Sequence, residues 1–150
     1  MHFFIVFTLI LSLVSTSDEY LELEDNIGRN CLSTDYITIR EFLVDPWPPQ
    51  SCSSSFVTIK VEFNKPNFGV SVINYGTVNN RQQWVYEYQP IGEMFPQYSN
   101  ETFEFLISWP KDYGNYITQV TFDGINMPPS INACWEFSYI IERNPDFLSD

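Results

Sequence analysis

The chain has 150 residues, 44% of them hydrophobic and 17% aromatic, and seven Lys and Arg set against 19 Asp and Glu give a formal net charge of -12. This composition favours a packed globular protein over a disordered chain. The charge excludes nucleic-acid binding, because almost nothing is available to neutralise a row of phosphates, and it disfavours electrostatic adsorption to anionic membranes.

The amino terminus has the pattern of a secretory signal peptide. An apolar run from Phe3 to Val14 is followed by small polar residues, with Ser15 and Ser17 placed for cleavage before Asp18. The run is too short to span a bilayer, and no second apolar run of about 18 residues follows it. We therefore expect residues 1–17 to be removed and the rest to enter the secretory pathway as a soluble chain.

The position of the only histidine limits the catalytic mechanisms and metal sites that the mature chain can have. The only histidine, His2, lies in the predicted signal peptide. A mature chain without histidine cannot run a Ser-His or Cys-His nucleophile system, and it lacks the commonest transition-metal ligand. Two carboxylates acting as in a glycosidase stay formally possible, but no spacing singles out a pair. We expect no enzymatic activity, no cofactor and no metal site.

Strand patterns fill most of the mature chain. Residues 18–30 form an acidic leader that we expect to be mobile. From Tyr36 onward, apolar and polar residues alternate in runs separated by Pro, Gly, Asn and Asp. The predicted strands are residues 36–44, 56–63, 68–75, 83–89, 101–110, 115–124 and 133–141. About seven strands without a convincing helix predict an all-β, immunoglobulin-like sandwich of two antiparallel sheets.

Asn100 begins the one N-glycosylation sequon, Asn-Glu-Thr, in a polar loop just ahead of a predicted strand. We expect it to be a candidate glycosylation site.

Three cysteines allow at most one intramolecular bridge. A bridge from Cys31 to Cys134 would close a loop of 134 − 31 = 103 residues, worth roughly 4.7 kcal/mol in the chain-entropy model. A bridge from Cys31 to Cys52 would close a much shorter loop. The energetics favour the long bridge without deciding between the two.

Two stretches carry a family resemblance. "NCLSTDYITIREFLVDPWPPQSC", followed by an alternating strand, and "ACWEFSYII" near the carboxyl end together resemble the MD-2-related lipid-recognition (ML) family, in particular its branch of Niemann-Pick type C cholesterol-transfer proteins. The resemblance spans roughly residues 30–143. It implies an ML-type domain over residues 31–143 followed by a tail, residues 144–150.

The resemblance also implies covalent and cavity features. It pairs Cys31 with Cys134 and leaves Cys52 as a free or intermolecular thiol, because Trp47 stands where the branch has the other cysteine of this corner. It further implies two sheets that splay around an apolar cavity, with rigid aromatic side chains as walls.

We expect the cavity residues to come from the inward faces of the strands and from the end where a ligand would enter. Met94 and Phe95 would form an apolar rim that touches a membrane transiently during transfer. The candidates are Trp84, Tyr86, Tyr88, Met94, Phe95, Phe103, Phe105, Tyr113, Tyr116, Phe122 and Phe137.

These features lead to two functional hypotheses. The first is a secreted or endolysosomal protein that carries a sterol, a fatty acid or a phospholipid between its sheets, with a protein receptor as a further candidate partner. The alternative is a secreted binding module that recognises carbohydrate or a protein surface through exposed aromatic side chains. A lipid carrier hides its aromatic residues between the sheets, whereas a sugar-binding module displays them on an outer face.

Overall fold

The computed structural model describes residues 27–32, 34–125 and 130–142, and these residues form strands and loops without a helix. Consequently no helix in this part of the chain could cross a membrane. The eight strands are β1 (Arg29–Leu32), β2 (Ile37–Asp45), β3 (Ser54–Phe63), β4 (Phe68–Asn79), β5 (Trp84–Phe95), β6 (Asn100–Ser108), β7 (Gly114–Gly124) and β8 (Ile131–Ile141).

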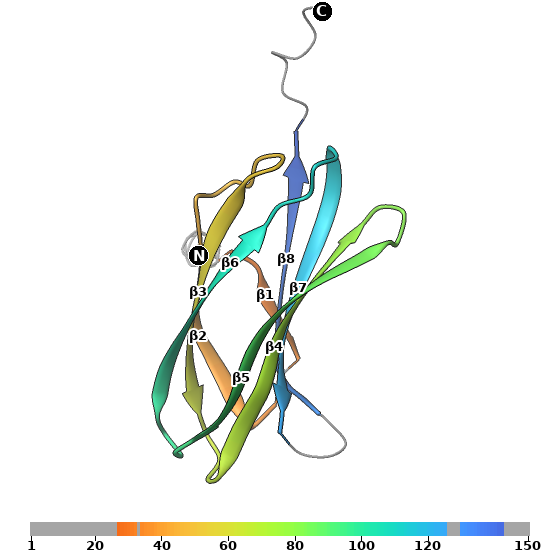
Figure 1. Cartoon of the computed structure of the whole chain (residues 1–150). Helices are drawn as coiled ribbons and strands as arrows, with labels where there is room; N and C mark the ends of the chain where they lie inside the picture. The colour runs from red at the N-terminus through yellow and green to blue at the C-terminus, as the bar shows by residue number, and fades with distance from the viewer. Residues whose placement is uncertain (1–26, 33, 126–129, 143–150) are drawn as a thin grey trace, which may run out of the picture.

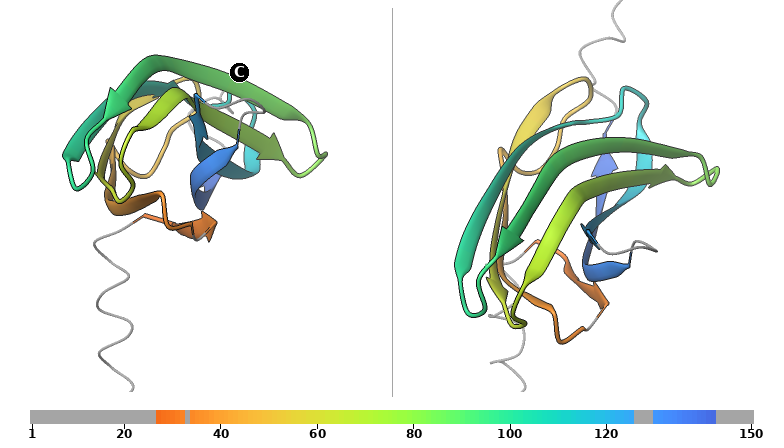
Figure 2. Two further views of the ribbon diagram at one scale, coloured as in Figure 1. Left: turned by 90° about the horizontal axis from the view of Figure 1, so that it is seen from below. Right: turned by 60° about the horizontal axis from the view of Figure 1, so that its bottom comes forward.

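The strands form two antiparallel sheets that pack face to face (Figure 1). One sheet has five strands in the order β1-β8-β7-β4-β5, and the other has three in the order β2-β3-β6. Two further views show β5 and β6 along one side of the sandwich, each at the edge of its own sheet (Figure 2). The predicted all-β, two-sheet sandwich is therefore confirmed.

The shortest strand, β1, is absent from the sequence prediction. It pairs with β8 through Arg29 opposite Glu136 and Leu32 opposite Cys134. Residues 29 and 30 belong to the segment expected to be a mobile leader, so the sandwich begins slightly earlier than predicted. The expectation was wrong there because the partner of a four-residue strand is more than 100 residues away, and local sequence gives no sign of that pairing. The signal peptide, most of the leader and the tail lie outside the described residues.

Aromatic rings from the two sheets meet across the interior. Phe105 on β6 lies 4.3 Å from Tyr75 on β4, measured between ring centroids, and their planes are 11° apart. Phe63 on β3 and Phe95 on β5 make an equally close stacked pair. On the other side, the Phe42 ring of β2 stacks on Trp135 of β8 at 5.5 Å. These ring pairs hold the sheets in contact along much of their length.

The contacts between the sheets correct the expectation of an open cavity. Sheets whose side chains interdigitate lie about 10 Å apart, and that spacing is filled by the side chains themselves. Here the interior is occupied by a continuous cluster that includes Phe42, Ile59, Tyr75, Phe122 and Ile141, each no more than 1% exposed. The buried members of the predicted cavity set, such as Phe103, Phe122 and Phe137, fill the interior instead of holding a cavity open.

A disulfide and a packed corner fasten the sandwich. Cys31 on β1 is bonded to Cys134 on β8, which confirms the long bridge. Trp47, in the Pro-rich corner after β2, meets Phe137 and Tyr139 edge-on at 6.0 and 6.3 Å. Cys52 is exposed and outside any disulfide of the described residues. The ring of Trp47 thus secures the corner where the ML branch has a small disulfide.

We expect removal of the bridge to destabilise the fold. Changing Cys31 and Cys134 together to Ser frees a loop of 103 residues, so the free energy of unfolding should fall by about 2–5 kcal/mol. Urea denaturation under oxidising conditions measures this change. Cys52→Ser is the matched control and should stay within about 0.5 kcal/mol of the parent, because its side chain is exposed. Equal midpoints for all three proteins would contradict the assigned role of the bridge.

Candidate functional site

Strand β5 turns a polar face toward the interior. The Glu87 carboxylate accepts a hydrogen bond from the backbone N–H of Ser108 on β6 at 3.0 Å. The Gln89 side-chain amide donates to the backbone carbonyl of Glu104, also on β6, at 3.0 Å. The Tyr75 hydroxyl donates to the Gln89 side-chain oxygen at 3.1 Å. Because β5 and β6 are edge strands of different sheets, these side chains replace a backbone ladder between them.

The opposite face of β5 therefore points into solvent. Side chains alternate across a strand, so with Glu87 and Gln89 inward, Trp84, Tyr86 and Tyr88 must point outward. Their exposed fractions are 45%, 50% and 58%. The prediction that these three residues line the interior is wrong. The alternation was read correctly, but the face was assigned by hydrophobicity, and in this edge strand the polar residues are the inward ones.

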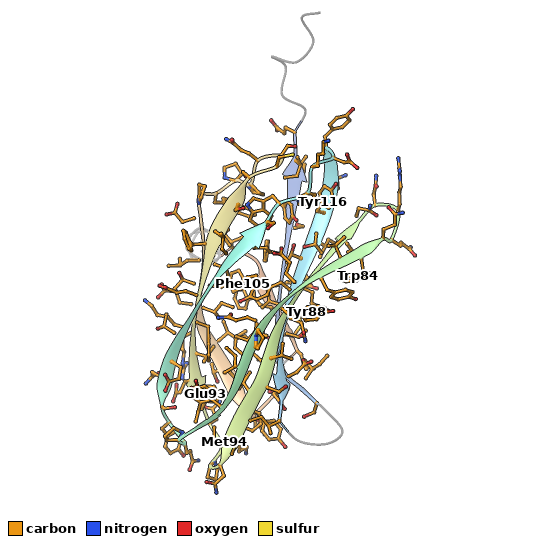
Figure 3. The ribbon with its side chains drawn as sticks, viewed as in Figure 1. Trp84, Tyr88, Glu93, Met94, Phe105 and Tyr116 are labelled. Atoms are coloured by element: carbon orange, nitrogen blue, oxygen red, sulfur yellow. A yellow bond between two sulfur atoms is a disulfide. The ribbon has the colours of Figure 1, made fainter. Side chains whose placement is uncertain are left out.

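The three outward rings form a row, which we call the aromatic row: Trp84, Tyr86 and Tyr88. Neighbouring ring centroids are 5.7 and 6.3 Å apart, and the planes differ by 10° and 19°. Figure 3 shows Trp84 and Tyr88 along β5, with Met94 toward the other end of the strand.

Gly76 on β4 lies opposite Tyr86 in the register and makes room for the rings. A Cβ atom built at Gly76 would lie 2.8 Å from Cε1 of Tyr86 and 3.2 Å from Cζ3 of Trp84. The contact with Tyr86 is shorter than real Cβ atoms show and the contact with Trp84 is tight, so a larger residue at Gly76 would require the Tyr86 ring to shift and the Trp84 ring to move slightly. The glycine thus lets the row lean over the neighbouring strand.

Polar side chains lie behind the row on the same outer face. The Asn74 amide of β4 donates to the Asp123 carboxylate at 2.7 Å and to the Thr121 hydroxyl at 3.3 Å. Asn74 is opposite Tyr88 in the register, so this polar group directly adjoins the row. At the far side of the sheet, Arg29 pairs with Glu136.

A hollow of about 530 Å³ opens at the Trp84 end of the row. It is lined by Val78, Asn79, Asn80, Asn115, Tyr116, Ile117, Ser138, Tyr139 and Ile140. In the strand register, Trp84 is opposite Val78, Val78 is opposite Ile117, and Ile117 is opposite Ser138. The hollow therefore begins beside the Trp84 end of the row and extends across β4, β7 and β8. Of these residues the sequence prediction included only Tyr116. Ile117 and Ile140 gave a signal that was missed, because each is apolar at a position that alternates with buried residues.

The other predicted cavity residues fall into two groups. Phe95, Phe103, Tyr116, Phe122 and Phe137 are buried, and Phe105 is half-buried against the core. Met94 and Tyr113 are exposed, at 56% and 58%. Phe95 cannot form a rim with Met94, because consecutive residues of a strand point to opposite faces and Phe95 stacks inside on Phe63.

Asn100 and Thr102 of the sequon are exposed on β6. Their sheet is the three-stranded one, so a glycan at Asn100 would lie away from the aromatic row. Glycosylation of Asn100 stays a prediction.

Burial alters the titration of two core tyrosines. It raises the pKa of Tyr75 above its ordinary value of 10.0, with a further contribution from the negative charge of Glu87. Burial also raises the pKa of Tyr139, although a hydrogen bond with Thr118 acts in the opposite direction. Both hydroxyls therefore stay protonated over the physiological range. Among the described residues, no cluster of His, Cys, Asp and Glu is suited to hold a metal ion.

Comparison with known proteins identifies the fold but not a family. No protein-family model and no curated protein matches the chain. The C-terminal domain of wzt has a similar structure, with a TM-score of 0.65 and 10% identity over 79% of this chain and 83% of that chain. A Niemann-Pick type C2 protein from Japanese carpenter ant has a TM-score of 0.52 and 10% identity over 77% of this chain and 99% of that chain. These similarities establish a shared β-sandwich architecture, and the second supports an ML-like fold.

The core tyrosines should make stability depend on alkaline pH. A raised folded-state pKa means that the stabilisation is complete below the unfolded value of about 10 and is lost as the pH rises through the folded value. The free energy of unfolding should therefore fall above about pH 10. Tyr75→Phe should make the decline shallower by up to about 1.4 kcal/mol per pH unit, measured by urea denaturation between pH 8 and 11. Tyr98→Phe is the control for the loss of a tyrosine hydroxyl. Equal slopes of the free energy of unfolding against pH for Tyr75→Phe and the parent would contradict the raised pKa of Tyr75.

Proposed function

We propose that the chain is a secreted, non-catalytic binding module that holds neutral carbohydrate against the aromatic row. The observation that carries this proposal is the outward placement of three near-parallel rings beside polar groups on one sheet face. Large aromatic side chains in a core are explained by packing, but Trp84, Tyr86 and Tyr88 are about half exposed. An exposed row of this kind marks an interaction surface.

Carbohydrate suits this surface for a physical reason. One face of a pyranose presents C–H bonds, which contact the electron-rich face of an aromatic ring, while its hydroxyl groups need polar partners at the edge. The rings of the aromatic row supply the apolar contact. The polar partners are Asn74, on the neighbouring strand β4, and Asp123, which is hydrogen-bonded to Asn74 from β7. No chemical step is required, so the ligand is released unchanged.

The net charge narrows the class of glycan. A chain with a formal charge of -12 repels uronates, sialic acids and sulfated sugars. A neutral oligosaccharide avoids this cost. The disulfide between Cys31 and Cys134 supports a secreted location, because such bonds persist in oxidising compartments.

Truncation of the aromatic row should abolish binding. We expect Trp84→Ala and Tyr86→Ala each to raise the dissociation constant for a neutral oligosaccharide at least tenfold, equivalent to about 1.4 kcal/mol, because each removes a stacking surface. A glycan array with the parent protein selects the ligand, and isothermal titration calorimetry measures the variants.

Phe56→Ala is the matched control. Phe56 is an aromatic residue of β3 that is 61% exposed on the three-stranded sheet, so its loss should leave the affinity unchanged. A parent protein that binds no neutral glycan on the array would overturn the proposal. Capture of a protein partner that requires Trp84 would reassign the row to protein recognition.

A second candidate function is lipid carriage between the sheets, which the ML resemblance suggests. The observation that favours it is the side of the sandwich between β5 and β6, where side-chain hydrogen bonds rather than a backbone ladder join the sheets. Parting these strands would expose the stacked pair of Tyr75 and Phe105, and a sterol or acyl chain could replace the contact between the two rings. On this proposal the protein would carry its lipid in the secretory or endolysosomal lumen and contact membranes transiently.

The lipid proposal predicts a stoichiometric lipid in the purified secreted protein. Native mass spectrometry followed by organic extraction would detect it, and a fluorescent sterol or fatty acid should bind an emptied sample. Val120→Trp, which adds bulk at a fully buried position of β7, should prevent uptake, whereas Trp84→Ala should not affect it. A protein that purifies without lipid and takes up neither probe would eliminate this candidate.

A further inference from the structure

The hollow at the Trp84 end of the aromatic row has a chemistry different from that of the row. Its apolar side chains are Val78, Ile117 and Ile140: Val78 on β4 is opposite Ile117 on β7, and Ile140 on β8 is opposite Asn115, diagonal to Ile117. Ile117 and Ile140 are 47% and 59% exposed, so they do not serve the core. Branched apolar side chains kept at the surface beside exposed aromatic residues form part of an interaction surface.

The polar residues of the hollow are three asparagines, one serine and the two tyrosines Tyr116 and Tyr139. Asn79 is engaged in the turn between β4 and β5, where its side-chain oxygen accepts from the backbone N–H groups of Arg81 and Gln83. Asn115 and Ser138 stand on the wall, on β7 and β8. None of the residues that line the hollow is charged. A ligand group that fits must therefore be neutral, with a small apolar part and a hydrogen-bonding part.

We propose that this hollow accepts the acetamido group of an N-acetylhexosamine, so that the glycan bound by the row is an N-acetylated one. The inference rests on the proposed carbohydrate function and names its substrate class. The acetamido methyl group packs against Ile117 and its apolar neighbours. The amide N–H and C=O exchange hydrogen bonds with Asn115 and Ser138, which can donate and accept.

Position and size agree with this assignment. Trp84 is opposite Val78, and Val78 is opposite Ile117, so directly paired side chains lie about 4.5–5.5 Å apart from Cβ to Cβ. A sugar stacked on Trp84 thus has its substituents within reach of the hollow. The volume of about 530 Å³ lies within the range of small-ligand pockets and exceeds what a bare acetamido group needs, so part of the sugar ring enters as well.

A pair of matched oligosaccharides tests the inference. Cellotetraose and tetra-N-acetylchitotetraose share a β-1,4-linked glucose backbone and differ at C2, where the first carries a hydroxyl and the second an acetamido group. Calorimetry on the intact mature protein should give at least tenfold tighter binding of the acetylated sugar. In saturation-transfer NMR, the acetyl methyl protons should receive the strongest transfer from the protein.

Two separate variants locate the effect. Ile117→Ala and Ile140→Ala should each weaken binding of the acetylated sugar at least threefold more than they weaken binding of cellotetraose, because only the first sugar carries the acetamido group. Trp84→Ala should weaken the binding of both sugars to the same extent. Leu106→Ala, an exposed apolar residue of β6 in the other sheet, is the matched control and should change neither affinity.

The outcomes separate this inference from the proposed function. Equal affinities for the two sugars, both dependent on Trp84, would overturn the acetamido assignment and retain the carbohydrate function. Absence of binding to either sugar and to the glycan array would overturn both. A preference for the acetylated sugar that persists in Ile117→Ala and Ile140→Ala would place acetamido recognition outside the hollow and overturn the inference.

Discussion

Contact between aromatic rings of the two sheets is the interaction on which the rest of the structure depends. Phe42 reaches Trp135, Phe63 reaches Phe95, and Phe105 reaches Tyr75 across the interior. Each ring buries on the order of 150–250 Å² with few rotatable bonds, so the pairs hold the sheets close together and leave the interior filled. Strands β2 to β8 therefore each turn one face toward this layer, and most side chains on their other faces are at least partly exposed.

Strand β5 shows how an edge position reverses the usual distribution of side chains. Its backbone edge faces β6 of the other sheet without a ladder, and Glu87 and Gln89 satisfy backbone groups of β6. An inward-pointing charged residue at an edge also discourages pairing with a second chain. Since the polar side chains are needed on the inside, the aromatic side chains of this strand remain outside. The requirement that closes one side of the sandwich thus creates the aromatic row.

The two proposed functions place a ligand at different parts of one scaffold. The bridge from Cys31 to Cys134 and the sandwich itself agree with the family resemblance in the sequence. The interior is filled, and the aromatic row is exposed on the outer face. The side-chain contacts between β5 and β6 separate the two modes physically, because a lipid would have to break them, whereas a glycan on the outer face would leave them intact.

The sequence by itself determined seven of the eight strands, their alternation and the class of fold, because an apolar period of two is a local property of each strand. It also identified Cys31, Cys134 and several of the buried aromatic residues, such as Phe103, Phe122 and Phe137. Only the tertiary structure decided which face of β5 points inward and that Val78, Ile117 and Ile140 meet in one hollow. Periodicity shows which residues share a face, but the partner of that face is set by sheet order and register, which join residues far apart in the chain.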